Sequence, residues 1–381
     1  MHRTSGVVFR LALITFCVFG FANAYFLLAS FLELRGFSPA TTGLMVSAFY
    51  GTTLMTRPLA GSCIERRGTR FTLLAAGGCA LLGSGGLMLF SSAPGIFCCR
   101  VVSGIGFSLG TVALAAYQGL AIPPEERGKS FALTAIGSIV TMLVVVPLGE
   151  GLMGAGYPLG YLALPPLLAL GTIALGGTLP PLSASQVPPS WGTWRDLLGL
   201  RSYRWILGTA LCFSLADASV LFLSTLVGEA GLSASPFMAA TAGGAVLART
   251  LGLRIMTPRW RPFLAPAAAA LMGLAVGLLP WAHSAALLST FGVLFGVGVG
   301  FAYPVNLALV GDLLPPALGP KGSAGLLFAM DLCWMAVPLG LGAATPLMGL
   351  SRAYTIFALV IVAGAALLAL PLRRPKRPPS P

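Results

Sequence analysis

The chain has 381 residues, of which 56% are hydrophobic and 9% are charged, and its mean hydropathy is +0.90. A soluble fold cannot bury so much apolar surface, so the composition excludes a soluble protein and indicates a membrane protein. The net charge is +13, but the basic residues are dispersed along the chain, which argues against nucleic acid as a partner. Seven cysteines without CxxC spacing predict neither a disulfide framework nor a metal site.

Apolar runs of about 20 residues recur along the whole chain, and each can cross roughly 30 Å of hydrocarbon as a helix. The first run is too long for a signal peptide, lacks a small-residue cleavage site and is followed by eleven similar runs. Breaks at Pro, Gly and charged residues predict twelve membrane spans near residues 7–30, 41–62, 70–90, 95–118, 130–153, 158–178, 204–228, 234–254, 263–281, 284–311, 322–345 and 351–371.

The distribution of Lys and Arg tests this count, because these residues collect in cytoplasmic loops. An even number of spans puts both termini on one side, and of 23 Lys and Arg residues only Arg35, Arg100 and Arg352 fall on the other. The bias predicts a multi-pass protein of the cell membrane, or of the inner membrane in a Gram-negative bacterium, with both termini cytoplasmic. The basic tail 372–381 is expected to touch anionic lipid.

A shift of 194 residues brings unusual positions of the two halves of the chain into register. It pairs Arg10 with Arg204, Asn23 with Asp217, and the segment Gly104-Ile-Gly106 with Gly298-Val-Gly300. These pairs predict an N-terminal six-helix bundle over 1–178, a cytoplasmic linker over 179–203 and a C-terminal six-helix bundle over 204–371.

The segment GSCIERRGTR, residues 61–70, gathers charge between the second and third spans and reads Gly-x-x-x-Glu-Arg-x-Gly-x-Arg. It resembles the motif between helices 2 and 3 of the major facilitator superfamily. The resemblance implies an all-α membrane protein with twelve transmembrane helices in two pseudo-symmetric six-helix bundles. It also implies a gating latch that holds the two bundles in the outward-facing state, made by Gly61, Glu65, Arg66, Gly68 and Arg70. The alternative is a solvated basic turn.

Two further spans resemble helices of the same superfamily. In IFCCRVVSGIGFSLG, the position of Arg100 matches an arginine associated with proton transfer in proton-coupled members; the alternative is an arginine that snorkels to the membrane interface. The fifth span, GSIVTMLVVVPLGEGLMG, partly resembles the helix 5 pattern of antiporters. Its Pro147 is expected to bend the helix, as are Pro304 and Pro338 in the second half.

Acidic residues inside the spans are candidates for proton coupling. Asp217 lies well inside the seventh span and Asp331 inside the eleventh. Burial in hydrocarbon disfavours the charged form of a carboxyl group, which is the property that a proton carrier needs. A structural, hydrogen-bonded acid is the alternative for both. Glu150 lies near an outer end and is expected to be solvated, while Asp312 is expected to cap or pair at the cytoplasmic end of span ten.

Other polar and aromatic residues inside the spans are candidate substrate contacts or ordinary interior residues. An aromatic ring and an amide beside a helix break are reasonable substrate contacts, and a site of mixed aromatic, amide and acid groups suits a polar or cationic compound. The candidates are Asn23, Tyr25, Gln118, Tyr303, Asn306 and Trp334.

The chain has no phosphate-binding GxxxxGK[ST] motif, so the proton gradient is the expected driving force and no cofactor is expected. The resemblance favours export of a small organic molecule by proton antiport and alternating access, without enzymatic activity. Proton-coupled import of a nutrient or organic acid is one alternative. Another is a membrane sensor on the same fold that transports nothing. The expected partners are a small-molecule substrate, protons and the lipid bilayer, and the expected state is a monomer.

Overall fold

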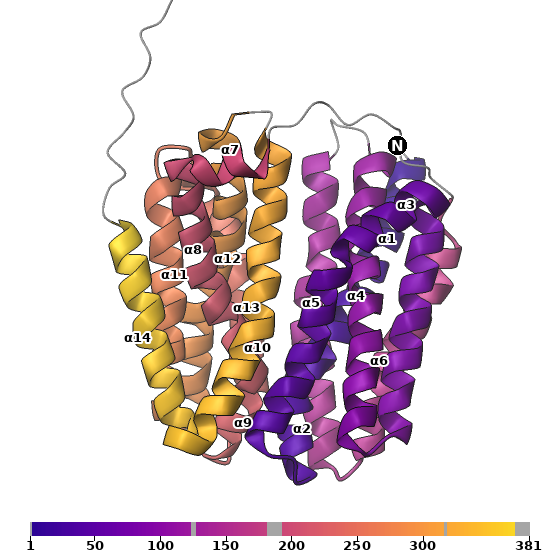
Figure 1. Ribbon diagram of the computed structural model, residues 1–381, viewed down its shortest axis with the longest axis vertical. Coiled ribbons are helices and arrows are strands. Elements are labelled where there is room, and N and C mark those ends of the chain that lie inside the picture. The colour runs from indigo at the N-terminus through magenta and orange to yellow at the C-terminus, as the bar shows by residue number, and fades with distance from the viewer. Residues whose placement is uncertain (1, 123–126, 181–192, 316–317, 370–381) are drawn as a thin grey trace, which may run out of the picture.

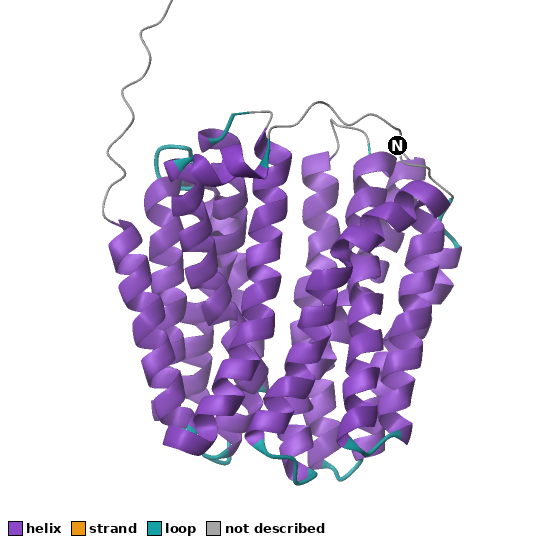
Figure 2. Cartoon of the chain, viewed as in Figure 1, coloured by secondary structure: helices purple, strands orange, loops and turns teal. Residues whose placement is uncertain are grey.

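The computed structural model describes residues 2–122, 127–180, 193–315 and 318–369, and within these ranges every regular element is helical (Figure 2). The first half of the chain forms α1 (His2–Asn23), η1 (Ala24–Leu27), α2 (Leu28–Leu34), α3 (Pro39–Leu89), α4 (Ala93–Ala121), α5 (Arg127–Gly154) and α6 (Pro158–Gly177). The second half forms α7 (Trp194–Gly199), α8 (Arg201–Ala218), η3 (Ser219–Phe222), α9 (Leu223–Gly228), α10 (Ser235–Leu251), η4 (Gly252–Arg254), α11 (Arg261–Leu278), η5 (Leu279–Trp281), α12 (Ala285–Leu313), α13 (Gly319–Met348) and α14 (Leu350–Ala369).

These elements make the twelve expected spans. The first span is α1, η1 and α2 in succession, and the seventh is α8, η3 and α9. The element α3 contains two spans joined at Gly68, whose φ of 80° and ψ of 166° turn the chain in a region that only glycine adopts readily. Ten helical stretches of the described residues are long and apolar enough to cross a membrane. The first part of α3 and the 17-residue α10 complete the set. The predicted fold class is confirmed.

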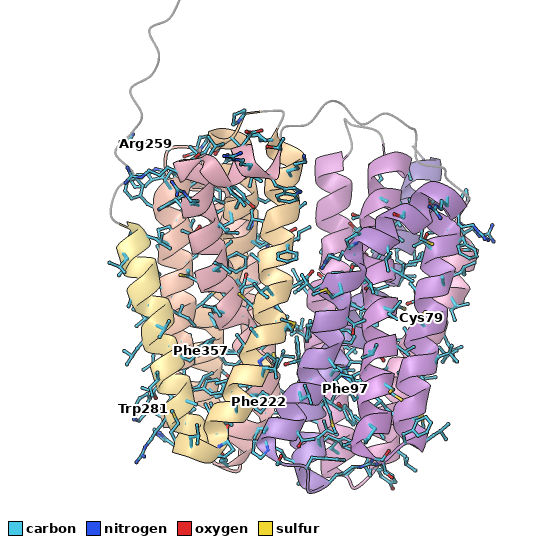
Figure 3. The ribbon with its side chains drawn as sticks, in the orientation of Figure 1. Cys79, Phe97, Phe222, Arg259, Trp281 and Phe357 are labelled. Carbon is cyan, nitrogen blue, oxygen red and sulfur yellow. The ribbon has the colours of Figure 1, made fainter. Side chains whose placement is uncertain are left out.

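Figure 1 shows two groups of helices, α1–α6 and α8–α14, which we call the N-terminal half and the C-terminal half. The N-terminus and α7 lie at one end of the molecule, together with the turn at Gly68; Arg259 labels this end in Figure 3. We call it the basic end, after Arg66, Arg67, Arg70, Arg254, Arg259 and Arg261. We call the opposite end, where α2 and α9 meet, the closed end.

Glycines allow the closest helix contacts in each half. A Cβ at Gly106 would lie 2.6 Å from the backbone nitrogen of Ala80, and one at Gly300 would lie 2.6 Å from the Cβ of Ala248. Neither separation is tolerated, so only glycine lets α4 and α12 approach their neighbours this closely. The two positions are related by the 194-residue shift, so the repeat in the sequence corresponds to repeated packing.

Candidate functional site

Asp217 lies one residue before the end of α8, where the helix gives way to the 3₁₀ turn η3. Its neighbours Ala216 and Ala218 are fully buried, whereas Asp217 itself is half-buried. The side chain of Trp334 on α13 lies within hydrogen-bonding reach of its carboxylate. A carboxylate inside a membrane is costly unless it is paired or protonated. A carboxylate held by one neutral donor is therefore a candidate for binding a proton or a cation.

The first half repeats this break in the helix. Asn23 ends α1 and is followed at once by the 3₁₀ turn η1, just as Asp217 precedes η3. The two positions are structurally equivalent, as the 194-residue shift predicts. One half thus has a neutral amide where the other has an acid, and the site is chemically unequal across the pseudo-symmetry.

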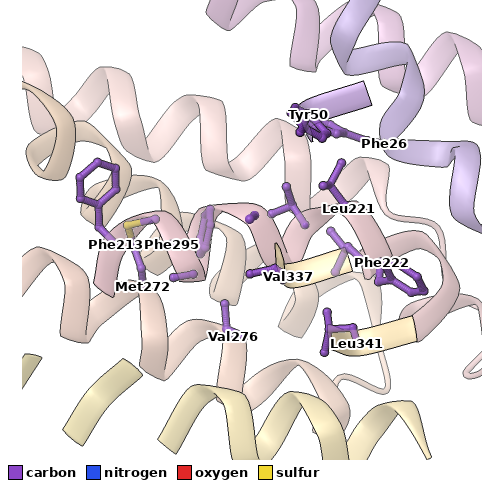
Figure 4. Close-up of a cluster of buried hydrophobic side chains, with 14 of the residues drawn as sticks. Phe26, Tyr50, Phe213, Leu221, Phe222, Met272, Val276, Phe295, Val337 and Leu341 are labelled. Carbon is purple, nitrogen blue, oxygen red and sulfur yellow. The ribbon is translucent and has the colours of Figure 1, made fainter. Parts of the chain in front are cut away.

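Trp334 and two aromatic rings of the N-terminal half meet near Asp217. The Trp334 ring stacks on Phe26 of η1 with centroids 6.0 Å apart, and lies 5.0 Å from the ring of Tyr50 on α3. Tyr50 lies within electrostatic reach of Asp217 and Asp331. Figure 4 labels Phe26 and Tyr50 in the same part of the view, with Leu221 of η3 below them. Of these three rings, sequence reasoning selected only Trp334, because Phe26 and Tyr50 carry no motif that separates them from other interior aromatics.

Asp331 forms an ion pair with Arg57, which joins α13 to α3 across the two halves. The Nε and Nη2 atoms of Arg57 donate to the two carboxylate oxygens, with 2.9 Å between Nη2 and Oδ1. Sequence reasoning counted Arg57 only as a basic residue near the cytoplasmic end of the span 41–62; it lies inside α3, eleven residues before the turn at Gly68. The carboxylate of Asp331 is therefore compensated, unlike that of Asp217.

Arg100 is completely buried within the N-terminal half. Its guanidinium lies 4.2 Å from the ring centroid of Tyr25 and 4.4 Å from that of Phe49, and its Nε donates to the carbonyl oxygen of Met45 at 3.3 Å. The alternative in which Arg100 snorkels to the interface is wrong, because no part of its side chain is exposed. Tyr25 is likewise buried, as a wall of this arginine pocket.

Two of the three candidate amides, those of Asn23 and Asn306, are hydrogen-bonded within their own halves. The Nδ2 atom of Asn23 donates to the Thr141 hydroxyl at 2.5 Å. The side chain of Asn306 accepts from the Thr209 hydroxyl at 2.6 Å and donates to the Ala302 carbonyl at 2.9 Å. Both amides are buried, so these contacts favour a role in helix packing.

Two other candidates lie apart from Asp217. Gln118 is three residues before the end of α4 at the basic end, whereas Asp217 is sixteen residues along α8 from that end, roughly 24 Å at the helical rise. Tyr303 on α12 is partly exposed and lies within electrostatic reach of Arg57 and Arg249. The structure brings neither to the aromatic rings.

The motif residues at 61–70 lie at the basic end, where their described contacts stay within the N-terminal half. Gly68 makes the turn, Arg66 is exposed, and Arg70 donates to the carbonyl of Gly177 at the end of α6. No neighbouring element lies within 4 Å of a Cβ at Gly61, so no other helix approaches it closely in this conformation. The side chain of Glu65 lies outside the described residues.

The three candidate bending prolines lie inside helices that continue past them, Pro147 in α5, Pro304 in α12 and Pro338 in α13. The carbonyl oxygen of Pro338 lies against Gly43 of α3, closer than any Cβ at that position would allow. The segment of α13 around Pro338 thus takes part in the contact between the halves.

Glu150 connects the halves at the closed end, where a solvated carboxylate was expected; that expectation is wrong. Its oxygens accept from the backbone N–H of Ala234 at 2.6 Å and of Ser235 at 2.9 Å, and from the hydroxyls of Ser233 and Ser235. A carboxylate is favoured at a helix N-terminus, here that of α10. Nearby, the hydroxyl of Ser30 donates to that of Ser224 at 3.1 Å. At the basic end, Asp312 pairs with Arg261, as expected.

The described residues contain no cluster of His, Cys, Asp and Glu that could hold a metal ion. The hydrogen bonds, ion pair and ring contacts that we find between the halves extend from Arg57 and Asp331 toward the closed end. The arrangement is a group of acidic and aromatic side chains at the junction of two bundles, sealed on one side.

Comparison with known proteins identifies the family. A family model described as the Major Facilitator Superfamily matches residues 11–338. The uncharacterized MFS-type transporter YhhS of Escherichia coli strain K12 is 26% identical over 378 residues, which cover 91% of this chain and 86% of that protein. The multidrug resistance protein Stp of Mycobacterium tuberculosis is 30% identical over 148 residues. That match covers 36% of this chain and 27% of Stp, so the chain spans about a quarter of that relative's length.

Solved structures agree on the fold. The xylose transporter XylE of E. coli, in an inward-open conformation, has a TM-score of 0.73 at 16% identity and covers 98% of both chains. A bacterial homologue of the lysosomal transporter Spinster has a TM-score of 0.70 at 15% identity, covering 96% of this chain and 97% of that one. The nucleoside transporter NupG also has a TM-score of 0.70 at 15% identity, covering 95% and 98%.

Proposed function

The chain belongs to the Major Facilitator Superfamily, and from this premise we propose that it exports a small organic molecule by proton-coupled alternating access. A multi-pass secondary transporter is the coarse function; the coupling ion and the direction are our proposal. The single observation that supports it best is Asp217, a half-buried carboxylate at the junction of the halves with the neutral Trp334 as its hydrogen-bonding partner.

Alternating access requires contacts between the halves that can open at one end and form at the other. The contacts of Glu150 with α10 and of Ser30 with Ser224 hold the closed end together. The excess of Lys and Arg supports a cytoplasmic location for the basic end and for both termini. This conformation then faces the cytoplasm, and the motif at 61–70 engages the C-terminal half only in the opposite state.

Proton coupling needs a group whose protonation changes the balance between the two states. Protonation of Asp217 removes an uncompensated charge from the junction. Protonation of Asp331 would release Arg57 and weaken the bridge between α3 and α13. Arg100 is sealed behind the rings of Tyr25 and Phe49 and acts through its field on this region. Export is favoured by the partial match to a multidrug resistance protein and by the helix 5 pattern around Pro147.

The test is proton movement in proteoliposomes that enclose a pH-sensitive dye, with a panel of organic cations, sugars, nucleosides and organic acids added outside. We expect at least one compound to move protons in the wild-type protein, and Asp217→Asn to abolish this movement. Glu229→Gln, a change of an exposed acid, is the control and should leave it intact. Compound uptake without proton movement in the wild type would refute the coupling, and the sign of the proton movement decides between antiport and symport.

A further inference from the structure

We infer that the substrate of this site is an organic cation with an apolar or aromatic body, held by the carboxylate of Asp217 and the rings of Phe26, Tyr50 and Trp334. The inference deepens the proposed function by naming a substrate class. It takes from that function one assumption, that the transported compound binds between the halves.

The aromatic rings supply one part of the recognition. Phe26 and Tyr50 of the N-terminal half lie 6.0 Å and 5.0 Å, centroid to centroid, from Trp334 of the C-terminal half, so a ligand that contacts this group of rings touches both halves at once. Ring faces attract cations through their quadrupole, and Trp and Tyr do so most strongly. The same faces provide apolar surface for the body of the ligand.

The charge of the ligand follows from the pairing of the acids. Asp331 is bound by Arg57 and Asp312 by Arg261, and these are the two ion pairs found among the described residues. Asp217 has the Trp334 side chain as its partner and belongs to neither pair. A ligand cation would give this carboxylate the partner that the other two acids already have.

The neighbouring positive charges do not change this conclusion. Arg57 is held by both oxygens of Asp331, and Arg100 is enclosed by Tyr25 and Phe49 with its Nε on a backbone carbonyl. Arg249 lies in the last turn of α10, toward the basic end, within reach of Tyr303. None of the three is paired with Asp217.

Two other substrate classes fit less well. An organic anion would meet the carboxylate of Asp217 and be repelled. A sugar or nucleoside needs amide and hydroxyl partners, but the amides of Asn23 and Asn306 are already hydrogen-bonded inside their own halves to Thr141 and Thr209. Each would have to lose a buried partner in order to bind a hydroxyl group.

The experiment measures binding without transport, on the purified full-length protein at pH 8, with radiolabelled tetraphenylphosphonium in a scintillation proximity assay. Tetraphenylborate, which has the same shape and the opposite charge, is the competitor that isolates the effect of charge. We expect saturable binding to the wild type, at least tenfold weaker binding to Asp217→Asn, and a loss of roughly threefold or more for Trp334→Leu. Asp217→Glu should stay near the wild type, and Trp281→Phe, which changes an exposed tryptophan at the closed end, should have no effect.

Equal binding to the wild type and Asp217→Asn, or equal competition by tetraphenylborate, would overturn the inference. If Asp217→Asn does not fold, Trp334→Leu and Asp217→Glu still decide the question. Unchanged binding to Trp334→Leu would contradict the inference, and so would a complete loss of binding to folded Asp217→Glu. Saturable cation binding without any proton movement would refute the proposed coupling and leave the substrate class standing. Proton movement driven only by uncharged compounds would refute the substrate class and leave the proposed coupling standing.

Discussion

Arg57 on α3 and Asp331 on α13 form a two-point ion pair that joins the halves of the protein inside the membrane. The Arg57 side chain is 24% exposed and that of Asp331 is 11% exposed, so the pair is shielded from most solvent. The ion pair lies between the basic end and the aromatic rings around Trp334. The contacts between the halves begin at this pair and extend toward the closed end. A bridge at this place resists separation of the two bundles.

We predict that Asp331→Asn lowers the stability of the observed conformation by about 2 kcal/mol, because Arg57 then loses a charged partner in a shielded place. Arg57→Met should have a similar effect. The thermal unfolding midpoint of each variant, measured in detergent, should fall by several degrees. In the charge-swapped double variant, Arg57→Asp with Asp331→Arg, part of the loss should return. If each single change leaves the midpoint at its wild-type value, the ion pair does not contribute to the stability of this conformation.

Glu150 is predicted to hold the first turn of α10 in place. The carboxylate accepts two backbone N–H groups and two hydroxyls, and Glu150→Gln removes its charge while keeping one carbonyl oxygen. A loss of about 1 kcal/mol, typical for a carboxylate at a helix N-terminus, makes local opening roughly five times more frequent. Hydrogen exchange of the amides of Ala234 and Ser235 should accelerate by that factor. Glu229→Gln is the matched control, and equal acceleration in both variants would contradict the specific role of Glu150.

Gly43 is predicted to be required for the contact between α3 and α13 at the closed end. A Cβ there would collide with the carbonyl oxygen of Pro338 and lie tightly against the Cα of Gly342, 3.2 Å away. Gly43→Ala should therefore favour separation of α3 from α13 at this end. A cysteine placed at Ser30, beside Ser224, should react several times faster with a membrane-impermeant maleimide in this variant than in the parent.

Gly85→Ala is the control for Gly43→Ala, because it lies in the same element and a Cβ there meets no other atom within 4 Å. It should leave the labelling rate unchanged. Identical rates for Gly43→Ala and Gly85→Ala would show that the tight contact at Gly43 does not limit opening.

The planar guanidinium group of Arg100 is predicted to be required for stability, so lysine should not replace it. The flat guanidinium lies over the faces of both Tyr25 and Phe49, whose ring centroids are 5.9 Å apart, a geometry that an ammonium group does not reproduce. Arg100→Lys should therefore lower the thermal midpoint by several degrees. Phe97→Leu, at a partly exposed position on the same helix, should change it little. A midpoint equal to that of the wild type would show that stacking on the rings contributes nothing.

Hydropathy and the glycine pattern of the sequence were sufficient to predict the twelve spans, because each span is a local property of about 20 residues. Asp217 and Asp331 could be selected because acids are rare inside the spans. The repeat at 194 residues also predicted the equivalence of Asn23 and Asp217, which the 3₁₀ turns η1 and η3 confirm.

Contacts between the halves could not be predicted, because they join residues far apart in the sequence. Arg57 was counted only as one of the basic residues near the cytoplasmic side, and only the approach of α13 shows that it pairs with Asp331. Glu150 was expected in solvent, since nothing in its own helix indicates that the N-terminus of α10 lies beside it. Phe26 and Tyr50 become distinctive only when Trp334 is placed against them.

The central claim is that the two ends of the protein open in alternation, and the most direct test is a pair of distance measurements by electron paramagnetic resonance. One pair of spin labels replaces Ser62 on α3 and Ala324 on α13, both exposed and near the basic end. The other replaces the exposed Leu34 and Leu347 at the closed end, in a background that lacks the native cysteines.

We predict two populations for each pair of labels. A change of pH or the addition of a transported compound should shorten the distance at the basic end as it lengthens the distance at the closed end. A single distance for each pair that responds to neither treatment, or distances that lengthen together, would contradict alternating access.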